Sequence, residues 1–310
     1  MDFIQQGNTG KLGKWKYLLP VLGFFGIIAL NFVAILLLDL DVDEMMRKSI
    51  ERNGANWFLF ESLIPMAIFL AGLFIWVKYV HKQSITSLTT SRKKIDWKRI
   101  FFAFTLWGII TAAMTIAAYY LTPEDFVWNL DWNKFLILAA IAIVLVPIQT
   151  SFEEYFFRGY LMQGLATVVK NRWFPLLFTS IVFGLMHGAN PEVDKLGPII
   201  MVYYIGTGLF LGVITLMDEG LELALGFHAA NNLITALLVT SDWTAFQTDS
   251  IFRDVSEPSA GFDILIPVLV IFPILLFVFA KKYNWTNWKE KLTGKIVAIS
   301  TSDDNYKVID

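Results

Sequence analysis

The chain has 310 residues, of which 56% are hydrophobic and 17% are charged, and its formal net charge is -2. An ordinary soluble domain has roughly 25% charged residues, so this composition favours a membrane protein. The small net charge and the dispersal of the basic residues over short loops argue against nucleic acid as a partner. The absence of cysteine excludes thiol nucleophiles, thiolate metal sites and disulfide bonds.

Hydrophobic runs of about 20 residues, each long enough for a helix to cross a bilayer core of roughly 30 Å, recur along the chain. Eight candidate spans lie at about 17–38, 57–77, 101–121, 133–150, 173–187, 199–217, 221–239 and 264–280. The first run is longer than the core of a signal peptide and further spans follow it, so we predict a retained anchor. The sequence therefore predicts an all-α, polytopic membrane protein with about eight transmembrane helices.

The connections between these spans differ in charge. Basic residues follow the second, fourth and last spans, at Lys78, Lys82, Arg92, Lys93, Lys94, Lys98, Arg99, Lys170, Arg172, Lys281, Lys282, Lys289, Lys291 and Lys295. Acidic residues dominate the alternate loops, at Glu124, Asp125, Asp131, Glu192, Asp194, Asp242, Asp249, Asp254, Glu257 and Asp263. Because positively charged segments stay in the cytoplasm, we expect both termini to be cytoplasmic. The polar tail after Gly294 is predicted to be disordered.

The stretch SFEEYFFRGY, residues 151–160, places three ionisable residues just after the fourth span. An ionisable group within a span costs at least ~2.5 to 3.5 kcal/mol on insertion scales, so it is rare unless it faces a cavity or a partner. Glu154 and Arg158 are four residues apart on one helix face and can neutralise each other. Glu153 points about 100° away from Glu154, which makes it the candidate base. A girdle of salt bridges at the membrane interface is the structural alternative.

Two of the three histidines lie in apolar segments. His187 ends the run SIVFGLMH, and His228 lies within LALGFHAANNLITALL. A lone histidine in such a place is more often structural. His228 and Asn232 share one helix face, where an imidazole nitrogen and an amide N–H suit a developing oxyanion. An interhelical polar clamp explains this pair equally well, and Asn231, about 100° away, is predicted to be a packing or capping group.

Other notable residues in these spans have structural explanations. Phe183 lies four residues before His187, so its ring can pack beside the imidazole. Gly208 and Gly212 form a small-xxx-small pair that predicts close helix packing without a chemical role. Pro147 frees a backbone carbonyl and kinks a helix, either beside a wet cavity or for packing.

These residues form three motifs in chain order: E-E-x-x-x-R at Glu153, Glu154 and Arg158, F-x-x-x-H at Phe183 and His187, and H-x-x-x-N at His228 and Asn232. The ordered set on separate apolar helices resembles the CAAX protease and bacteriocin-processing family (CPBP, or Abi), which are intramembrane glutamic endopeptidases of the type II CAAX prenyl endopeptidase kind. The resemblance makes 131–245 the catalytic core. Residues 1–130 then contribute three membrane helices, and 246–310 the last span and a cytoplasmic tail.

The resemblance implies an eight-helix fold with a cavity open to the cytoplasm, in which water activated at Glu153 hydrolyses a peptide bond. It implies that His187 assists Glu153, that His228 and Asn232 hold the oxyanion, and that Glu154 and Arg158 support the base. Prenylated C-terminal peptides, bacteriocin leaders and membrane-protein termini are all suitable substrates. We expect no cofactor, the lipid bilayer and a peptide or protein as partners, and a location in a bacterial cell membrane.

The depths of these residues conflict if the fourth span ends near Ser151. Counted from the cytoplasmic side at about 1.5 Å per residue, His187 is about 21 Å from Trp173 and His228 about 10 Å deep, whereas Glu153 is near the surface. We expect a break near Pro147 or Ser151, with 151–170 dipping into the bilayer or lying along its inner leaflet.

Three other functions compete with the glutamic peptidase. Glu153, His187 and His228 are a sufficient ligand set for catalytic zinc, although the chain has no H-E-x-x-H helix. Intramembrane Glu, His and Arg also form proton relays in transporters, but no repeat-related pair of interrupted helices is found. The third alternative is a non-catalytic immunity or scaffold protein, in which the motif residues have only a structural role.

Overall fold

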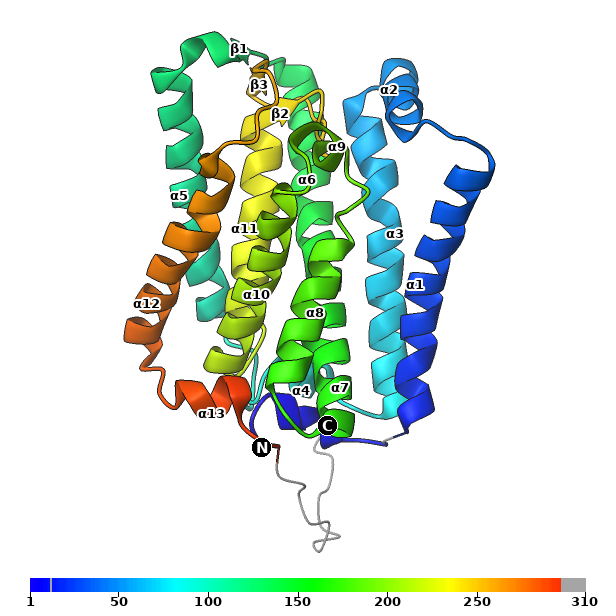
Figure 1. The fold of residues 1–310 in the computed structure, drawn as a ribbon, viewed down its shortest axis with the longest axis vertical. Coiled ribbons are helices and arrows are strands. Elements are labelled where there is room, and N and C mark those ends of the chain that lie inside the picture. Colours follow the sequence, from blue (N-terminus) through cyan, green and yellow to red (C-terminus); the bar gives the residue numbers. More distant parts are fainter. Residues whose placement is uncertain (12, 297–310) are drawn as a thin grey trace, which may run out of the picture.

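The computed structural model describes residues 1–11 and 13–296, and this part is mostly helical, which confirms the predicted all-α class (Figure 1). The α-helices are α1 (Lys14–Leu37), α2 (Val42–Asn53), α3 (Ala55–Ile75), α4 (Ile85–Thr89), α5 (Trp97–Leu121), α6 (Trp132–Glu154), α7 (Met162–Val169), α8 (Trp173–Leu185), α9 (Pro191–Leu196), α10 (Ile200–Asp218), α11 (Glu222–Leu238), α12 (Phe272–Tyr283) and α13 (Trp288–Thr293). The disordered tail expected after Gly294 falls mainly on 297–310, outside the described residues.

The long helices run side by side, so the bundle has two ends (Figure 1). We call the end with α4, α13 and the N-terminal 3₁₀ helix η1 (Ile4–Asn8) the terminal end. The opposite end, which carries α2, α9 and a small β-sheet, is the distal end. Strands β1 (Phe126–Trp128) and β2 (Val239–Ser241) flank β3 (Phe252–Asp254), antiparallel and parallel to it respectively, and Phe252 lies opposite both Trp128 and Val239.

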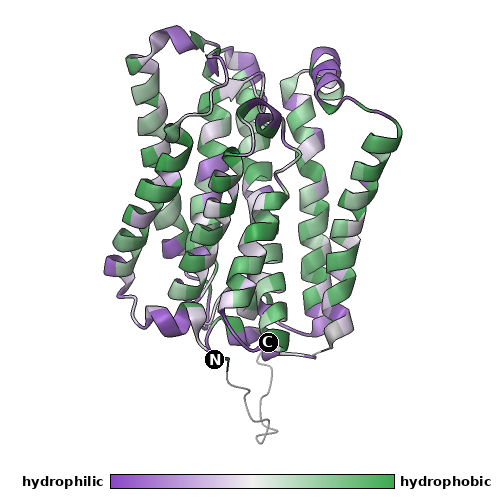
Figure 2. Ribbon diagram, in the orientation of Figure 1, coloured by the Kyte–Doolittle hydropathy of each residue, from purple (hydrophilic) through white to green (hydrophobic). Residues whose placement is uncertain are grey.

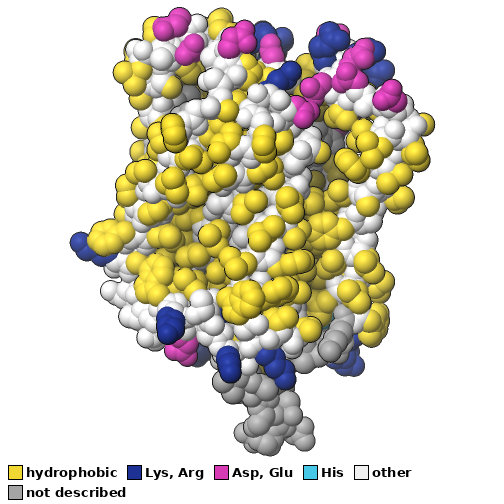
Figure 3. All heavy atoms as spheres, in the orientation of Figure 1, with side chains coloured by type: hydrophobic (Ala, Val, Ile, Leu, Met, Phe, Trp, Pro, Cys, Tyr) yellow, Lys and Arg dark blue, Asp and Glu magenta, His cyan; other side chains and the backbone are white. Residues whose placement is uncertain are grey.

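Among the described residues, five helices are long and apolar enough to cross a membrane. They are Trp15–Leu37, Ala55–His81, Trp97–Leu121, Trp132–Val169 and Ile200–Asp218. The other three predicted spans are helical but shorter: α8, α11, and a π-helical turn (Pro267–Ile271) that continues into α12. The count of eight spans therefore stays a prediction. Apolar residues occupy the middle of the bundle (Figure 2) and form a hydrophobic band on its surface, with charged side chains gathered at the two ends (Figure 3).

The predicted end of the fourth span at residue 150 is wrong. The helix runs on without interruption from Trp132 to Val169, as α6, a π-helical segment (Tyr155–Leu161) and α7, so the break expected near Pro147 is absent. At about 1.5 Å per residue, Glu153 lies about 24 Å from Val169, and His187 lies about 21 Å from Trp173. These similar depths let the two side chains meet without any dip of the chain.

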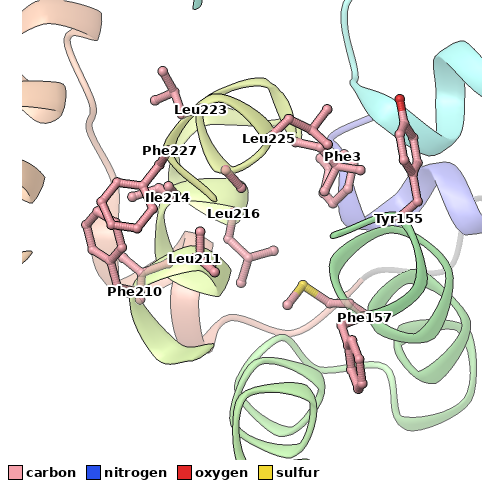
Figure 4. Packing of buried hydrophobic residues seen from close by; sticks show 14 of the residues in the cluster. Phe3, Tyr155, Phe157, Phe210, Leu211, Ile214, Leu216, Leu223, Leu225 and Phe227 are labelled. Carbon is pink, nitrogen blue, oxygen red and sulfur yellow. The ribbon is translucent and has the colours of Figure 1, made fainter. Parts of the chain in front are cut away.

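The hydrophobic core extends to the terminal end, where η1 covers the bundle. Figure 4 shows Phe3 beside Tyr155, across from the packed side chains of α10 and α11 such as Phe210 and Phe227. Phe3 is fully buried, and its carbonyl accepts a hydrogen bond from Gln163 Nε2 at 3.1 Å. The aromatic and aliphatic residues there exclude water from the base of the bundle.

Helices α8 and α10 pack closely through glycines. A Cβ atom on Gly208 would lie 2.6 Å from the carbonyl oxygen of Ser180, and one on Gly212 would lie 2.6 Å from Leu176 Cδ1. Real Cβ atoms do not approach other atoms so closely, so only glycine fits at position 208, against the backbone, whereas at position 212 the Leu176 side chain would have to shift. The predicted packing role of both glycines is confirmed. Gly208 also accepts a hydrogen bond through its carbonyl, as described below.

Candidate active site

Glu154 and Arg158 form a buried pair at the junction of α6 and the π-helical segment. Arg158 Nη1 lies 3.0 Å from Glu154 Oε1, and both side chains are 0% exposed. The pair predicted from the four-residue spacing is therefore present. The second guanidinium edge is also held, because Arg158 Nη2 donates to the carbonyl of Gly208 at 3.1 Å and the guanidinium lies 4.1 Å from the ring centroid of Phe183. These contacts fix Arg158 between three helices.

His228 of α11 links this pair to Glu153. Its Nδ1 lies 2.7 Å from Glu154 Oε1, and its Nε2 lies 3.6 Å from Glu153 Oε2. Because Glu154 is paired with Arg158, we treat it as a carboxylate that accepts the hydrogen bond, so Nδ1 carries the proton. Nε2 then faces the second glutamate. His228 is only 4% exposed and so lies behind the surface that solvent reaches.

Glu153 differs from Glu154 in its surroundings. Its side chain is 16% exposed, and its Oε1 accepts a hydrogen bond from Gln149 Nε2, one helical turn earlier. Its Oε2 is buried and has no hydrogen-bond partner among the described residues. A buried carboxylate oxygen with an unused acceptor position is unusual and calls for an explanation such as a catalytic role. Glu154 Oε2 also lacks a partner there, but its side chain is fully buried, so Glu153 is the glutamate that reaches the cavity.

Asn232 is positioned by polar neighbours on both sides. Its Nδ2 donates to Gln149 Oε1 at 3.2 Å, and its Oδ1 accepts from Asn231 Nδ2 at 3.1 Å. Asn231 is itself held by Trp107, whose Nε1 donates to Asn231 Oδ1 at 3.1 Å. Asn231 is therefore a packing residue as predicted, and it orients the Asn232 amide. One N–H of Asn232 Nδ2 is left for another acceptor.

His187 lies just beyond α8, in the turn before α9. Its Nδ1 is 2.9 Å from the carbonyl oxygen of Phe183, which can only accept, so Nδ1 carries the proton and Nε2 is free to accept. The imidazole stacks on the ring of Tyr204, with 4.5 Å between centroids and a 20° interplanar angle, and it also contacts Phe183. The predicted packing of Phe183 beside His187 is present.

A cavity of about 640 Å³ joins these side chains. It is lined by Gln149, Glu153, His187 and Asn232 together with apolar residues of α1, α2, α3, α6 and α8. The structure thus brings Glu153, His187 and Asn232 to one wall and places His228, Glu154 and Arg158 behind it. Their chemical roles stay predictions.

Sequence reasoning missed two polar contributors. Gln149 holds both Glu153 and Asn232, and its signal was the four-residue spacing to Glu153 within an otherwise apolar run. Tyr204 stacks on His187 and donates its hydroxyl to Glu192 at 3.1 Å. No spacing connects Tyr204 to a motif, because the contact joins α10 to the turn that follows α8.

Both site histidines engage Nδ1 and leave Nε2 unused, as metal-ligating histidines commonly do. Within residues 1–11 and 13–296, however, no three His, Cys, Asp or Glu side chains are grouped closely enough to hold a metal ion.

Residues 131–234 match the family model of the Rce1-like type II CAAX prenyl endopeptidases, which confirms the resemblance drawn from the motifs. All of the candidate site residues lie inside the matched region. The chain is also 28% identical, over 244 residues, to the uncharacterized protein YyaK of Bacillus subtilis (strain 168). The aligned region covers 76% of this chain and 80% of YyaK. No solved structure matches the chain. The family match and the apolar helices together imply an intramembrane protease.

Proposed function

We propose that the protein is an intramembrane endopeptidase in which Glu153 activates the water that attacks a peptide bond. The observation that carries this proposal is the contrast between the two glutamates. Glu154 is fully buried with its charge engaged by Arg158 and His228, whereas Glu153 is partly exposed and lines the cavity, where its carboxylate can accept a proton. A general base must have such a free acceptor within reach of its substrate.

The hydrolysis follows from the groups on the cavity wall. Glu153 takes a proton from water as the oxygen bonds to the carbonyl carbon of the scissile peptide, and negative charge develops on the carbonyl oxygen. The remaining N–H of Asn232 donates to that oxyanion. The C–N bond then breaks as the proton passes from Glu153 to the leaving amine, with His187 placed on the same wall to assist the transfer.

We assign His228 to positioning because it lies behind the cavity wall. Its Nδ1 donates to Glu154 and its ring lies between the two carboxylates, with Nε2 3.6 Å from Glu153 Oε2, so it spaces Glu153 from the Glu154–Arg158 pair. This modifies the expectation from the family resemblance, in which His228 holds the oxyanion together with Asn232. Hydrogen bonds from His228 to Glu154 and from Gln149 to Glu153 fix the base without occupying its free oxygen.

The apolar walls of the cavity favour a substrate with a hydrophobic segment at the membrane, lipidated or not. Phe58, Leu63, Phe152 and Met186 line it around the polar groups. Such a lining removes water from an apolar segment and strengthens the electrostatic interactions at the scissile bond. The test is cleavage of candidate peptides by membranes that contain either the natural chain or Glu153→Gln. A folded Glu153→Gln protein that cleaves at the natural rate would refute the proposal.

A zinc peptidase with Glu153, His187 and His228 as ligands is the second candidate, because both histidines have Nε2 unengaged; since these side chains are not grouped closely enough within the described residues, they would have to move together to hold the metal. The two mechanisms respond differently to a chelator. Inhibition that added zinc reverses supports the metal mechanism, whereas full activity after metal removal supports Glu153 acting on water alone.

A further inference from the structure

The cavity at Glu153 continues into a groove at the distal end. The groove has a volume of about 740 Å³ and is lined by residues of α2, α9, the loop at 242–247 and Arg253 of β3. Met46, Pro191 and Gln247 line both the groove and the cavity, so the two spaces adjoin. Helix α2 lies across this passage, with Ser49 on the cavity side and Arg47 on the groove side. The cavity of the candidate site therefore extends toward the distal end and adjoins the groove there.

The terminal end is closed beneath the same site. Every residue of the π-helical segment Tyr155–Leu161 is buried, and none of the described residues that line the cavity belongs to η1, α4 or α13. A buried charge network adds to the closure: Arg92 lies 3.0 Å from Asp218 and 3.1 Å from Glu222, and Arg99 also bonds Asp218. A peptide at this end meets packed side chains instead of an opening.

The two ends carry opposite charge. The basic connections 78–99, 170–172 and 281–295 all lie at the terminal end, and the acidic loops 122–131, 192–194 and 242–263 lie at the distal end (Figure 1, Figure 3). Basic loops remain in the cytoplasm during insertion. The charge distribution thus assigns the terminal end to the cytoplasm and the distal end to the other side.

From the passage and the charges together, we infer that the substrate enters from the extracytoplasmic side, past α2. This inference rests on the proposed peptidase function and narrows its substrate. The substrate is then a peptide that has already crossed the membrane, such as a leader or an extracytoplasmic terminus with an apolar segment. It is not a prenylated terminus in the cytoplasm, because the cavity that the family resemblance places on that side opens at the opposite end.

The cysteine-free chain allows a direct test with single cysteines. Ser49→Cys lies in the passage, Glu257→Cys on an exposed distal loop, and Lys289→Cys on the exposed surface of α13. Intact cells that produce the full-length variants are treated with a membrane-impermeant maleimide, before and after permeabilisation. We expect Ser49→Cys and Glu257→Cys to react in intact cells and Lys289→Cys to react only after permeabilisation.

The opposite labelling of Glu257→Cys and Lys289→Cys would overturn the inferred orientation. Failure of Ser49→Cys to react in intact cells that label Glu257→Cys would overturn the inferred route. A bulky maleimide should also block cleavage in the Ser49→Cys protein and leave it unchanged in the Glu257→Cys protein. Labelling does not require catalysis and can be repeated with Glu153→Gln, so failure of the peptidase proposal is distinguishable from failure of this one.

Discussion

Glu153 and Glu154 are adjacent in the chain, but their carboxylates lie in different environments. The Glu154 side chain is 0% exposed and bonds Arg158 and His228, while that of Glu153 is 16% exposed and reaches the cavity. The separation arises because successive residues of a helix point about 100° apart. One carboxylate can therefore anchor the interior of the bundle while its neighbour is kept for chemistry.

This contrast predicts different defects for the two glutamates. Glu153→Gln should lower kcat by about 10²- to 10⁴-fold, the usual contribution of a general base, with the thermal stability unchanged. Glu154→Gln should lower the stability, because it removes the negative charge that compensates the buried guanidinium of Arg158. Peptide cleavage and thermal unfolding in detergent measure the two effects. A Glu153→Gln protein that loses stability as Glu154→Gln does would contradict the division of roles.

Asn232 is predicted to act on the transition state. Asn232→Asp keeps the shape of the side chain but removes the N–H donors, so kcat should fall by about 10²- to 10³-fold while KM changes little. Asn231→Ala is the matched control, since it removes a neighbour that only orients Asn232. Its kcat should fall less. Equal losses of kcat in the two variants would argue against an oxyanion role for Asn232.

Replacing Arg158 by an uncharged residue should lower the stability of the protein, because its buried partner Glu154 keeps its charge. Arg158→Met leaves Glu154 buried with only His228, so the free energy of unfolding should fall by about 3 to 5 kcal/mol. Arg253→Met is the control, because its pair with Asp242 is 45% and 66% exposed, and such pairs contribute about 0.2 to 1 kcal/mol. Denaturant unfolding in detergent measures the free energy of unfolding of both variants. Similar decreases would show that burial of the ion pair does not determine how much its loss destabilises the protein.

Gly208 tests the close crossing of α8 and α10. Gly208→Ala places a methyl group 2.6 Å from the Ser180 carbonyl oxygen, so overpacking should cost about 1 to 3 kcal/mol. Gly72→Ala is the control: it is also within a helix, but no atom lies within 4 Å of the added Cβ. There the protein should gain about 0.5 to 1 kcal/mol from the better helix former. A neutral Gly208→Ala would mean that the two helices separate easily.

Gln149 should act as a positioning residue. Gln149→Leu removes the bonds that hold both Glu153 and Asn232, so kcat should fall and KM should remain nearly constant. Thr150→Val, on the next residue, removes only a hydroxyl that bonds the backbone of its own helix and should leave kcat unchanged. Steady-state kinetics of the two variants tests this role. An increase in KM alone for Gln149→Leu would indicate that Gln149 binds the substrate instead.

Local spacing predicted the parts of the site that lie on single helices. The four-residue rule gave the Glu154–Arg158 pair and the packing of Phe183 against His187, both of which are present. The rule has no information about contacts between helices. For this reason Tyr204, which stacks on His187 from α10, was not found, and His228 was expected on the cavity wall instead of behind it.

The end of the fourth span was predicted wrongly because charge was taken as a sign of the membrane surface. Glu154, Arg158 and His228 satisfy one another, so the helix can continue through a buried stretch to Val169. Hydropathy alone treats each charge as exposed to solvent or lipid. The depth of a charged residue thus depends on partners that only the folded arrangement supplies.

The π-helical segment Tyr155–Leu161 has a consequence for insertions and deletions. Its i→i+5 bonds enclose one residue more than those of an α-helix, and such segments commonly arise where an α-helix has accommodated an extra residue. Shortening this segment by one residue would therefore restore regular α-helix and leave α7 facing nearly the same way relative to Glu153, whereas the same deletion in a regular α-helical stretch would turn everything after it by about 100°. Glu153 would then keep its registration with Gln163 and the N-terminal cover, so a change of chain length is better tolerated here than in α6 or α7.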